Sequence, residues 1–321
     1  MRKKITIGIT MGDPSGIGPE VVAKSLRSLR LPKGTGVWVF GDGVALMANG
    51  FKKPGPAVRI IDHGLVSPSQ MKSGVLSKQF GRASLEYIKS AVRSLRAAEI
   101  DCLVTGPVSK KAICLNGIAF EGHTEFLADQ FCVERYLMMF VADTMRVSVV
   151  SRHIPLGEVA ARLSRGAISR TIDLTFQALK EDFRIKNPRI AVLGLNPHAS
   201  DGGIMGHEEA DIIAPAIQDA QRKNNPGRIS GPLSPDTVFH RLLRNEFDAL
   251  VCMYHDQALI PFKMLHFNDG VNMTVGLPFV RTSCDHGTAF EIAGKNKADF
   301  HSMRNAIELA CRLSLNRLSR R

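Results

Sequence analysis

Short runs of β-branched and other apolar residues alternate along this chain with longer stretches in which apolar residues recur every three or four positions. The apolar runs predict buried parallel strands; they are KITIGIT, GVWVFGD, DCLVTGP, RVSVVSRH, RIAVLGLNPH and DALVCMYHD. The helical pattern covers residues 18–30, 80–99, 164–183 and 208–224. This alternation predicts an α/β fold whose sheet is covered by helices on both faces.

Three of the predicted strands end in a histidine, namely His153, His198 and His255. Ligands of open parallel sheets bind at the carboxyl ends of the strands, so three imidazoles at one edge indicate a site for a divalent metal ion. A single loop histidine more often serves only as a hydrogen-bonding side chain. Three at equivalent positions favour the metal site, and the donor set leaves zinc, cobalt, nickel, manganese or magnesium open.

Anion-binding side chains gather in the same class of loop. TGPVSKK leaves a strand through a glycine and a proline, and FEGHTEF opens a helix with His123 and Thr124 beside its N-terminus. Lys263, Asn272 and Arg281 add further donors nearby in sequence. Each charge-assisted contact to a phosphate or carboxylate contributes roughly 1.5–3 kcal/mol, so together these residues predict an acidic substrate.

The turn after the first strand, MGDPSGIGPEVV, resembles neither common nucleotide-binding loop. Its glycines have the wrong spacing for GxGxxG, and it lacks the GK[ST] ending of a P-loop. We interpret it as a tight strand-to-helix turn with Pro19 in the first helical turn.

The net charge of +12 raises the possibility of nucleic-acid binding. The basic residues are scattered, with small clusters at both ends and no aromatic-interleaved stripe, so a solvated basic surface that attracts small anions is the better interpretation. No apolar run is long enough to span a membrane, and the apolar stretch near the start is too short for a signal peptide. The six cysteines show no regular spacing and indicate buried thiols in the cytoplasm.

Two motifs at opposite ends resemble those of the isocitrate and isopropylmalate dehydrogenase group. GDPSGIGPEVV is similar to that group's GDGIGPEV, and HGTAFEIAGKNKAD resembles its HGSAPDIAGKGIAN nucleotide loop. A closer resemblance, along essentially the whole chain, is to the 4-hydroxythreonine-4-phosphate dehydrogenase family of vitamin B6 synthesis. It is carried by TGPVSK, GHTEF, SRHIPL, LNPHASDGG, GPLSPDTVF, YHDQALIPFK and GVNMTVGLPFVRTSCDHGTA. The chain departs from this family's pattern at Arg152, Ala258 and Cys284, and Phe290 stands where the isopropylmalate-type loop has proline.

This resemblance implies two α/β domains with mostly parallel sheets, an active site in the cleft between them, and a homodimer in which the partner completes the site. Residues 1–115 with 268–321 would form the nucleotide-side domain, and residues 116–267 the central domain with the metal ligands and dimer contacts. The family's metal ligands correspond to His153, His198 and His255. Its substrate-binding residues correspond to His123, Thr124, Lys263, Asn272 and Arg281. The cofactor loop corresponds to a segment that includes Asp285, His286, Gly287, Thr288 and Asp299.

The implied reaction is oxidation of the C3 hydroxyl of 4-phosphooxy-L-threonine by NAD or NADP with a divalent metal ion, followed by decarboxylation to 3-amino-2-oxopropyl phosphate. Asp236 and Asp256 are candidates for proton transfer or for orienting the histidines, and a turn or an ion pair is an equally open role for each. The nearest alternative is a 4-phospho-D-threonate or D-erythronate dehydrogenase of acid-sugar catabolism. A catalytically silent metabolite- or nucleic-acid-binding protein is disfavoured by the three histidines, Lys263 and Arg281.

Overall fold

The computed structural model describes residues 4–52, 55, 57–224 and 228–319, so parts of both terminal basic clusters lie outside the described residues. The chain divides into two compact units: unit 1 comprises Met1–Glu134 and Leu277–Arg321, and unit 2 comprises Arg135–Gly276. Unit 1 is therefore built from two separated segments. The functional domain boundaries predicted after residues 115 and 267 fall before these unit boundaries and stay a prediction.

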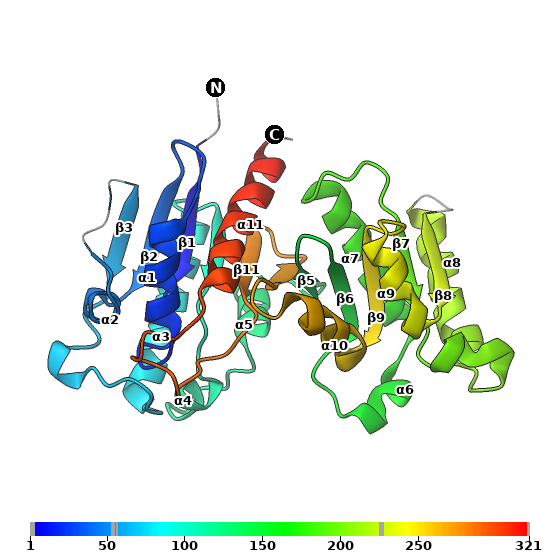
Figure 1. Ribbon diagram of the computed structural model, residues 1–321, viewed down its shortest axis with the longest axis horizontal. Coiled ribbons are helices and arrows are strands. Elements are labelled where there is room, and N and C mark those ends of the chain that lie inside the picture. The colour runs from blue at the N-terminus through cyan, green and yellow to red at the C-terminus, as the bar shows by residue number, and fades with distance from the viewer. Residues whose placement is uncertain (1–3, 53–54, 56, 225–227, 320–321) are drawn as a thin grey trace. The chain divides into compact units, whose positions relative to one another are not determined.

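Unit 1 contains a parallel sheet in the order β3-β2-β1-β4-β11. Its strands are β1 (Thr6–Thr10), β2 (Gly36–Gly41), β3 (Val58–Asp62), β4 (Cys102–Thr105) and β11 (Val280–Cys284). Its helices are α1 (Gly18–Ser28), α2 (Gly43–Ala48), α3 (Lys78–Arg96), α4 (Lys110–Cys114), α5 (His123–Gln130) and α11 (His301–Leu318). The helices α1 and α11 lie in front of the strands in Figure 1. Because β4 and β11 are parallel neighbours, their carboxyl ends lie side by side.

Unit 2 contains a mixed sheet in the order β10-β5-β6-β9-β7-β8. Its strands are β5 (Leu137–Val141), β6 (Arg146–Ser151), β7 (Ile190–Leu193), β8 (Ile229–Leu233), β9 (Ala249–Tyr254) and β10 (Val271–Val275). Its helices are α6 (Val159–Arg162), α7 (Arg165–Glu181), α8 (Ala214–Lys223), α9 (Pro235–Leu243) and α10 (His255–His266). The pairs β6–β9, β9–β7 and β7–β8 are parallel, whereas β5 is antiparallel to both β6 and β10.

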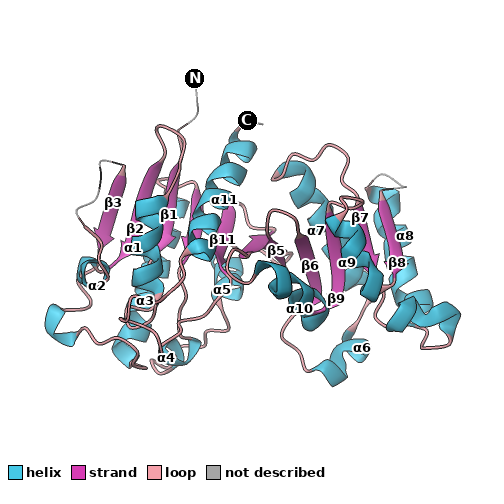
Figure 2. Cartoon of the chain, in the orientation of Figure 1, coloured by secondary structure: helices cyan, strands magenta, loops and turns pink. Residues whose placement is uncertain are grey.

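Alternate residues of the central strands of unit 2 enter two different cores. Val251 and Met253 of β9 pack in a cluster with residues of α7 and α8, whereas Leu250 and Cys252 pack in a second cluster with residues of α9 and α10. Successive strand side chains point to opposite faces, so helices cover both faces of this sheet. The predicted helix-covered α/β architecture is confirmed, as Figure 2 shows for each unit.

All six predicted strands and all four predicted helical stretches occur in the structure, with the last stretch divided into a π-helical turn at Glu209–Ile213 and α8. The strands β3, β5, β8, β10 and β11 were not predicted. Two of them, β10 and β11, carry Asn272 and Arg281. Polar residues interrupt the apolar runs there, so pairing with neighbouring strands, and not local pattern, fixes these segments.

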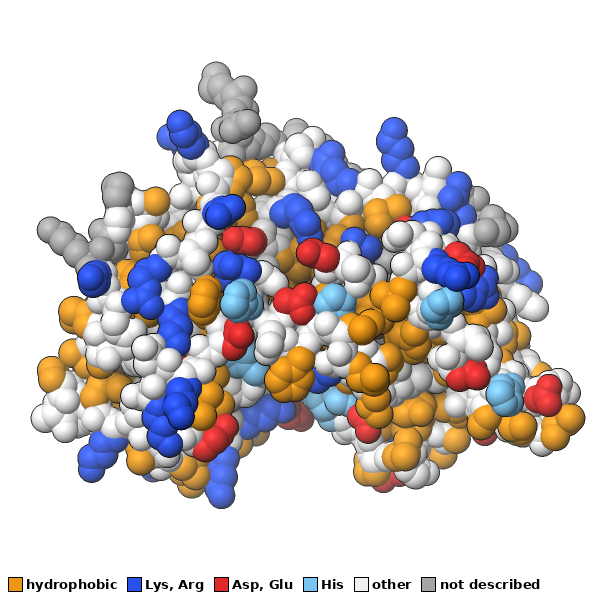
Figure 3. All heavy atoms as spheres, in the orientation of Figure 1, with side chains coloured by type: hydrophobic (Ala, Val, Ile, Leu, Met, Phe, Trp, Pro, Cys, Tyr) orange, Lys and Arg blue, Asp and Glu red, His pale blue; other side chains and the backbone are white. Residues whose placement is uncertain are grey.

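The described residues bear on three expectations from the sequence: the lack of a membrane span, the burial of the cysteine thiols and the scatter of basic side chains. Among them, no helix combines the length and hydropathy that a membrane-spanning segment requires. Cys102, Cys252, Cys284 and Cys311 are buried free thiols, as expected, but Cys114 and Cys132 are exposed. Lysine and arginine side chains are spread over the face of each unit in Figure 3 and do not form one stripe.

Candidate active site

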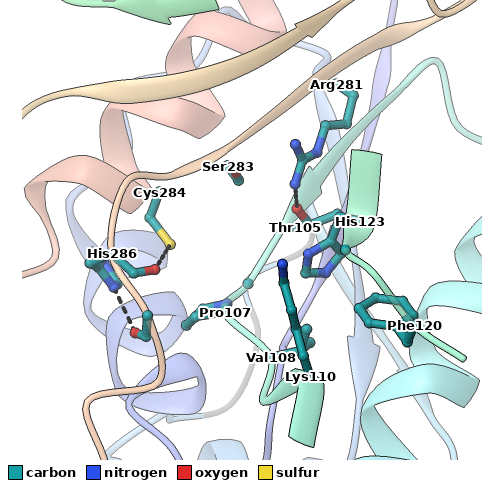
Figure 4. A pocket seen from close by; sticks show the side chains of 13 residues that line it. Thr105, Pro107, Val108, Lys110, Phe120, His123, Arg281, Ser283, Cys284 and His286 are labelled. Carbon is teal, nitrogen blue, oxygen red and sulfur yellow. Dashed lines mark hydrogen bonds between the residues drawn. The ribbon is translucent and has the colours of Figure 1, made fainter. Parts of the chain in front are cut away.

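A pocket in unit 1 opens at the carboxyl ends of β4 and β11. It encloses about 150 Å³, and Figure 4 shows its lining side chains. The lining residues come from the loop after β4, the start of α5 and the segment after β11: Thr105, Gly106, Pro107, Val108, Lys110, Phe120, Gly122, His123, Arg281, Ser283, Cys284, His286 and Gly287. It therefore unites predicted substrate-binding residues with predicted cofactor-binding residues.

Arg281 places a buried cation in the wall of this pocket. The residue is only 3% exposed. Its Nη2 donates to the Thr105 hydroxyl at 2.6 Å, and its Nη1 donates to the Thr124 hydroxyl at 3.5 Å. Burial lowers the pKa of Arg281 to about 10, so the guanidinium still carries its charge at neutral pH. The two hydroxyls fix its orientation but do not neutralise it, which favours an anionic ligand.

His123, the first residue of α5, adds a neutral hydrogen-bonding group beside this cation. Among the described residues, its buried Nε2 has no hydrogen-bond partner. Burial first, and then the charges of Arg281 and Lys110, hold the pKa of His123 well below its ordinary value of 6.5. The imidazole is therefore neutral at physiological pH and has one ring nitrogen available for a ligand in the pocket.

His286 lines the opposite wall, two residues after the end of β11 (Figure 4). Burial alone lowers its pKa, but the neighbouring Cys284 and Asp285 side chains and the Gly287 carbonyl outweigh burial and raise the pKa of His286 to about 9. Its Nδ1 lies 3.1 Å from the Gly287 carbonyl oxygen. At neutral pH this imidazole is consequently a second positive charge at the pocket.

The segment after β11 packs on the first turn of unit 1. The backbone N–H of Ile17 donates to the Thr288 carbonyl at 2.9 Å, and a Cβ added at Gly16 would lie only 3.0 Å from that carbonyl oxygen. Gly12 has a φ of +85°, and a Cβ there would lie 2.4 Å from the Pro107 carbonyl oxygen. MGDPSGIGPEVV is thus the tight strand-to-helix turn that its sequence predicts, with glycine required for close backbone approach.

Asp285 and Asp299, the acidic residues predicted to bind the cofactor, have partners within unit 1. The backbone N–H of Asp285 donates to the Ser302 hydroxyl at 2.9 Å. The Asp299 carboxylate accepts from the backbone N–H of His301 at 2.8 Å and lies 2.7 Å from its Nδ1. Asp299 therefore satisfies an N–H at the start of α11, and its contact to a cofactor stays a prediction.

Unit 2 places a second group of polar residues at the carboxyl ends of β6 and β9. The rings of His153 and His255 lie 5.9 Å apart between centroids. They line a pocket of about 220 Å³ together with Arg152, Ile154, Leu156, Val159, Tyr254 and Asp256. The Asp256 carboxylate lies 2.7 Å from Nδ1 of His255, which leaves Nε2 as the nitrogen available to a metal ion.

His198 lies in the loop after β7 and does not line this pocket. Its Nδ1 is 3.8 Å from the Asp236 carboxylate, and its side chain is 62% exposed. The backbone is left-handed from His198 to Gly202, a conformation that L-residues adopt with strain. Among the described residues, no three His, Cys, Asp or Glu side chains are close enough to hold a metal ion. The donor chemistry of His153 and His255 fits a divalent ion, and the three-histidine site stays a prediction.

Two further predicted substrate residues also belong to unit 2. The Lys263 ammonium, on α10, lies 5.7 Å from the centroid of the Phe267 ring. Asn272, on β10, has a buried Oδ1 without a hydrogen-bond partner in the described part of the chain. Neither lines the pocket around the two histidines, and their substrate contacts stay a prediction.

Side chains that the sequence analysis did not assign to the site complete the unit 1 pocket: Thr105, Lys110, Phe120, Ser283 and Cys284. The segment TGPVSKK carries an anion-binding signal, but its individual residues could not be ranked. Thr105 and Ser283 are register partners on β4 and β11. This pairing brings two distant segments together, and no local sequence pattern indicates it.

Comparison with known proteins gives consistent matches. The chain matches the family model described as pyridoxal phosphate biosynthetic protein PdxA over residues 42–310. It is 44% identical to a 4-hydroxythreonine-4-phosphate dehydrogenase from Desulfosudis oleivorans, covering 97% of this chain and 96% of that protein. It is 38% identical to a D-threonate 4-phosphate dehydrogenase from Salmonella typhimurium, covering 96% and 99%. It superimposes on the crystal structure of a 4-hydroxythreonine-4-phosphate dehydrogenase from Klebsiella pneumoniae with a TM-score of 0.84 at 36% identity, covering 97% and 98%.

Proposed function

The chain belongs to the pyridoxal phosphate biosynthetic protein PdxA family, and we propose from this premise that it is a 4-hydroxythreonine-4-phosphate dehydrogenase. It oxidises the C3 hydroxyl of 4-phosphooxy-L-threonine with NAD(P)⁺, and the resulting β-keto acid loses CO₂ to give 3-amino-2-oxopropyl phosphate. The observation that carries the proposal is the unit 1 pocket, where the buried Arg281 cation and the neutral His123 face one cavity. Such a pocket suits a phosphorylated small molecule.

The residues of this pocket hold and orient the substrate in the proposed reaction. Arg281 and His123 bind the phosphate, with Thr124 fixing the guanidinium through its hydroxyl. Lys263 and Asn272, which belong to unit 2, are further substrate-binding residues that the family resemblance implies. A clamp of this kind raises the rate because it fixes C3 in one position relative to the nicotinamide.

A divalent metal ion would be held by His153 and His255, with His198 as its third ligand. When bound, it would supply Lewis-acid chemistry; metal ions in proteins can lower the pKa of bound water from about 15.7 to about 7. Asp256 holds Nδ1 of His255 and thereby sets which ring nitrogen faces the ion. Asp236, beside His198, and Asp256 are the groups that we propose for proton transfer.

The cofactor is NAD or NADP, and the segment after β11 would hold it. His286 and Gly287 line the unit 1 pocket, and the buried Nε2 of His286 has no hydrogen-bond partner among the described residues. Asp285, Thr288 and Asp299 are the further contacts that the family resemblance implies. An uncommitted buried donor fits a bound polar cofactor because it would otherwise be left unsatisfied.

A second candidate is D-threonate 4-phosphate dehydrogenase. It is favoured by the Salmonella typhimurium relative of that name, which is 38% identical over almost the whole of both chains. Both candidate substrates carry a phosphate and a secondary hydroxyl, so the same pocket, metal site and cofactor serve either reaction. They differ in the group at C2 and in stereochemistry.

The proposal includes a homodimer that works in the cytoplasm. Large apolar side chains are exposed on and next to α10, with Ile260 61%, Met264 80% and Phe267 72% exposed. Exposed apolar side chains that lie close together are typical of protein interfaces, and a symmetric homodimer is the commonest assembly. Six free thiols fit a reducing compartment.

The test measures formation of reduced nicotinamide by the full chain loaded with one metal ion at a time. The two substrates, 4-phosphooxy-L-threonine and 4-phospho-D-threonate, are compared at matched concentrations, with chelator-treated protein as the control. Preference for the L-amino acid supports the first function, and preference for the sugar acid supports the second. Bound NAD(P) with no turnover of either substrate would overturn both.

A further inference from the structure

Lys110 extends into the unit 1 pocket, and the anion-binding signal of TGPVSKK did not single it out. It is the first residue of α4, and Figure 4 shows its side chain between His123 on one side and His286 on the other. A Cβ added at Gly122 would lie 3.6 Å from Lys110 Nζ. The ammonium group therefore lies against the glycine that precedes His123 and α5.

The charge of Lys110 is uncompensated within the described part of the chain, where the ammonium has no salt bridge or hydrogen bond. The backbone holds this lysine in place, because the hydroxyl of Ser109, the N-cap of α4, accepts from the Ala112 N–H at 3.1 Å. The neighbouring Lys111, on the same short helix, does not line the pocket. The two lysines therefore differ in their position relative to the cavity and share the same segment.

The electrostatics of the pocket favour a ligand with more than one negative charge. The charges of Arg281 and Lys110 both lower the pKa of His123, so both cations lie close enough to its ring to influence it. The acidic group nearby is Glu125, whose charge acts on Arg281 and whose Oε2 would lie 2.9 Å from a Cβ at Gly122. One carboxylate faces three positive groups at this pocket, Arg281, Lys110 and His286, so the pocket keeps a positive charge. A phosphate monoester carries about −1.5 to −2 charges at pH 7, which a carboxylate does not.

We propose that Lys110 is a phosphate ligand of the unit 1 pocket and selects phosphorylated substrates over their unphosphorylated counterparts. Together with Arg281 and the neutral His123 it surrounds the phosphate from three elements, α4, α5 and β11. Naming the phosphate as part of the substrate rests on the proposed function. Binding of a phosphate anion in the pocket does not.

The test is calorimetric titration of the full chain with inorganic phosphate, comparing wild type, Lys110→Met, Lys110→Arg and the matched control Lys111→Met. We expect Lys110→Met to weaken phosphate binding roughly 10- to 100-fold, Lys110→Arg to restore most of it, and Lys111→Met to change it less than about twofold. Lys110→Met should also raise the pKa of His123 in a histidine proton titration by NMR, because it removes one of the charges that lower it.

Each outcome decides the proposal. The proposal is overturned if wild type does not bind phosphate or if Lys110→Met does not change the affinity. It is also overturned if Lys110→Met and Lys111→Met weaken phosphate binding equally, because both lysines would then act only through the general positive charge of the surface. Selective loss in Lys110→Met with rescue by arginine supports it. If that pattern is found while neither phosphorylated substrate is oxidised, the phosphate site stands and the proposed dehydrogenase function falls.

Discussion

Arg281 on β11 donates a hydrogen bond of 2.6 Å to the hydroxyl of Thr105, which ends β4. The two residues are 176 positions apart in sequence and meet because β4 and β11 are adjacent parallel strands. Thr105 is 1% exposed and Arg281 3%, so the hydroxyl is a partner of a buried cation inside the pocket wall. The hydroxyl thus orients the group that we propose to bind phosphate.

Replacing Thr105 with valine tests this orientation. The change keeps the shape of the side chain but removes the acceptor, so the guanidinium loses a buried partner. We expect Thr105→Val to lower the free energy of unfolding by about 1–3 kcal/mol and to weaken phosphate binding at least about fivefold. Chemical denaturation and calorimetry measure the two effects.

Thr282→Val is the matched control for that variant. The Thr282 hydroxyl is also buried on β11, but it donates to the Ala306 carbonyl at 2.8 Å and does not contact Arg281. We expect a similar loss of stability, about 1 kcal/mol, with unchanged phosphate affinity. If both variants weaken phosphate binding equally, Thr105 acts only through general stability.

The histidine pair of unit 2 gives a prediction about metal binding. We expect His255→Ala to lower metal-dependent turnover more than about 100-fold and to reduce the bound metal, measured by elemental analysis, while the circular dichroism spectrum stays unchanged. His240→Ala, which changes an exposed histidine on α9, is the control and should retain metal and activity. Activity of His255→Ala near that of wild type would contradict the assignment.

The sequence located the strands that precede the three candidate metal-binding histidines, but not β10 and β11, which carry Asn272 and Arg281. The strands β6, β7 and β9 are parallel neighbours, so their carboxyl ends lie at one sheet edge. His255 follows β9 directly, whereas His153 and His198 lie further along the loops after β6 and β7, and their convergence on a metal ion stays a prediction. The prediction that these three strands end at one edge is confirmed. It could be made because a buried parallel strand is a continuous apolar run, and the first polar residues after the run mark its end. FEGHTEF likewise predicted a helix start, and α5 begins at His123.

The convergence of side chains could not be predicted in the same way. Arg281 and Lys110 reach one cavity through the pairing of β4 with β11, which no local pattern records. His198 shows the opposite case, since it lies in a loop of successive left-handed residues after β7, and no three potential ligands among the described residues are close enough to hold a metal ion. Loop conformation depends on non-local packing and polar contacts, so the position of a strand end does not determine the distances between side chains in the loops that follow.

Glu20 is predicted to position the cofactor loop. One of its carboxylate oxygens accepts from the Ala298 N–H at 2.8 Å and from Lys24 Nζ at 2.7 Å. Lys24 also donates to the carbonyls of Asn296 and Ala298. Because a neutral amide weakens these bonds, we expect Glu20→Gln to raise the KM for NAD(P)⁺ roughly five- to tenfold, with kcat changed less than about twofold in steady-state kinetics.

Glu86→Gln provides the comparison for the Glu20 variant. Glu86 forms an ion pair with Lys89 within α3 at 2.9 Å, and this pair is partly exposed and does not involve the cofactor loop. An exposed pair of this kind contributes little, so both kinetic constants should stay near those of wild type. A fall in kcat without a rise in KM in Glu20→Gln would instead indicate a different role for the carboxylate.

Asp13 is expected to lower the stability of the protein at neutral pH. It is fully buried in the turn after β1, and burial raises its pKa from 3.8 to about 6, against the opposing hydrogen bonds from the Ser15 and Ser109 backbone. Below pH 3.8 the carboxyl is protonated in both the folded and the unfolded chain. Between 3.8 and about 6 the unfolded chain ionises first, so the free energy of unfolding falls as the pH rises. The total corresponds to about 3 kcal/mol.

The variant Asp13→Asn should remove this pH dependence. It keeps an oxygen to accept from the Ser15 N–H, which Asp13 binds at 2.9 Å, but carries no charge. We expect it to be more stable than wild type by about 1–3 kcal/mol at pH 7.5 and equal to it near pH 4, measured by urea denaturation across the range. Asp143→Asn, at an exposed position, should leave the profile unchanged. If Asp13→Asn and wild type show the same dependence of unfolding free energy on pH, the buried carboxyl of Asp13 is not the group that causes this dependence. The backbone N–H of Asp13 donates to the Pro107 carbonyl at 2.8 Å, and Pro107 lines the unit 1 pocket. A buried carboxylate that lowers stability at this position is expected where a residue serves the site and not the stability of the fold.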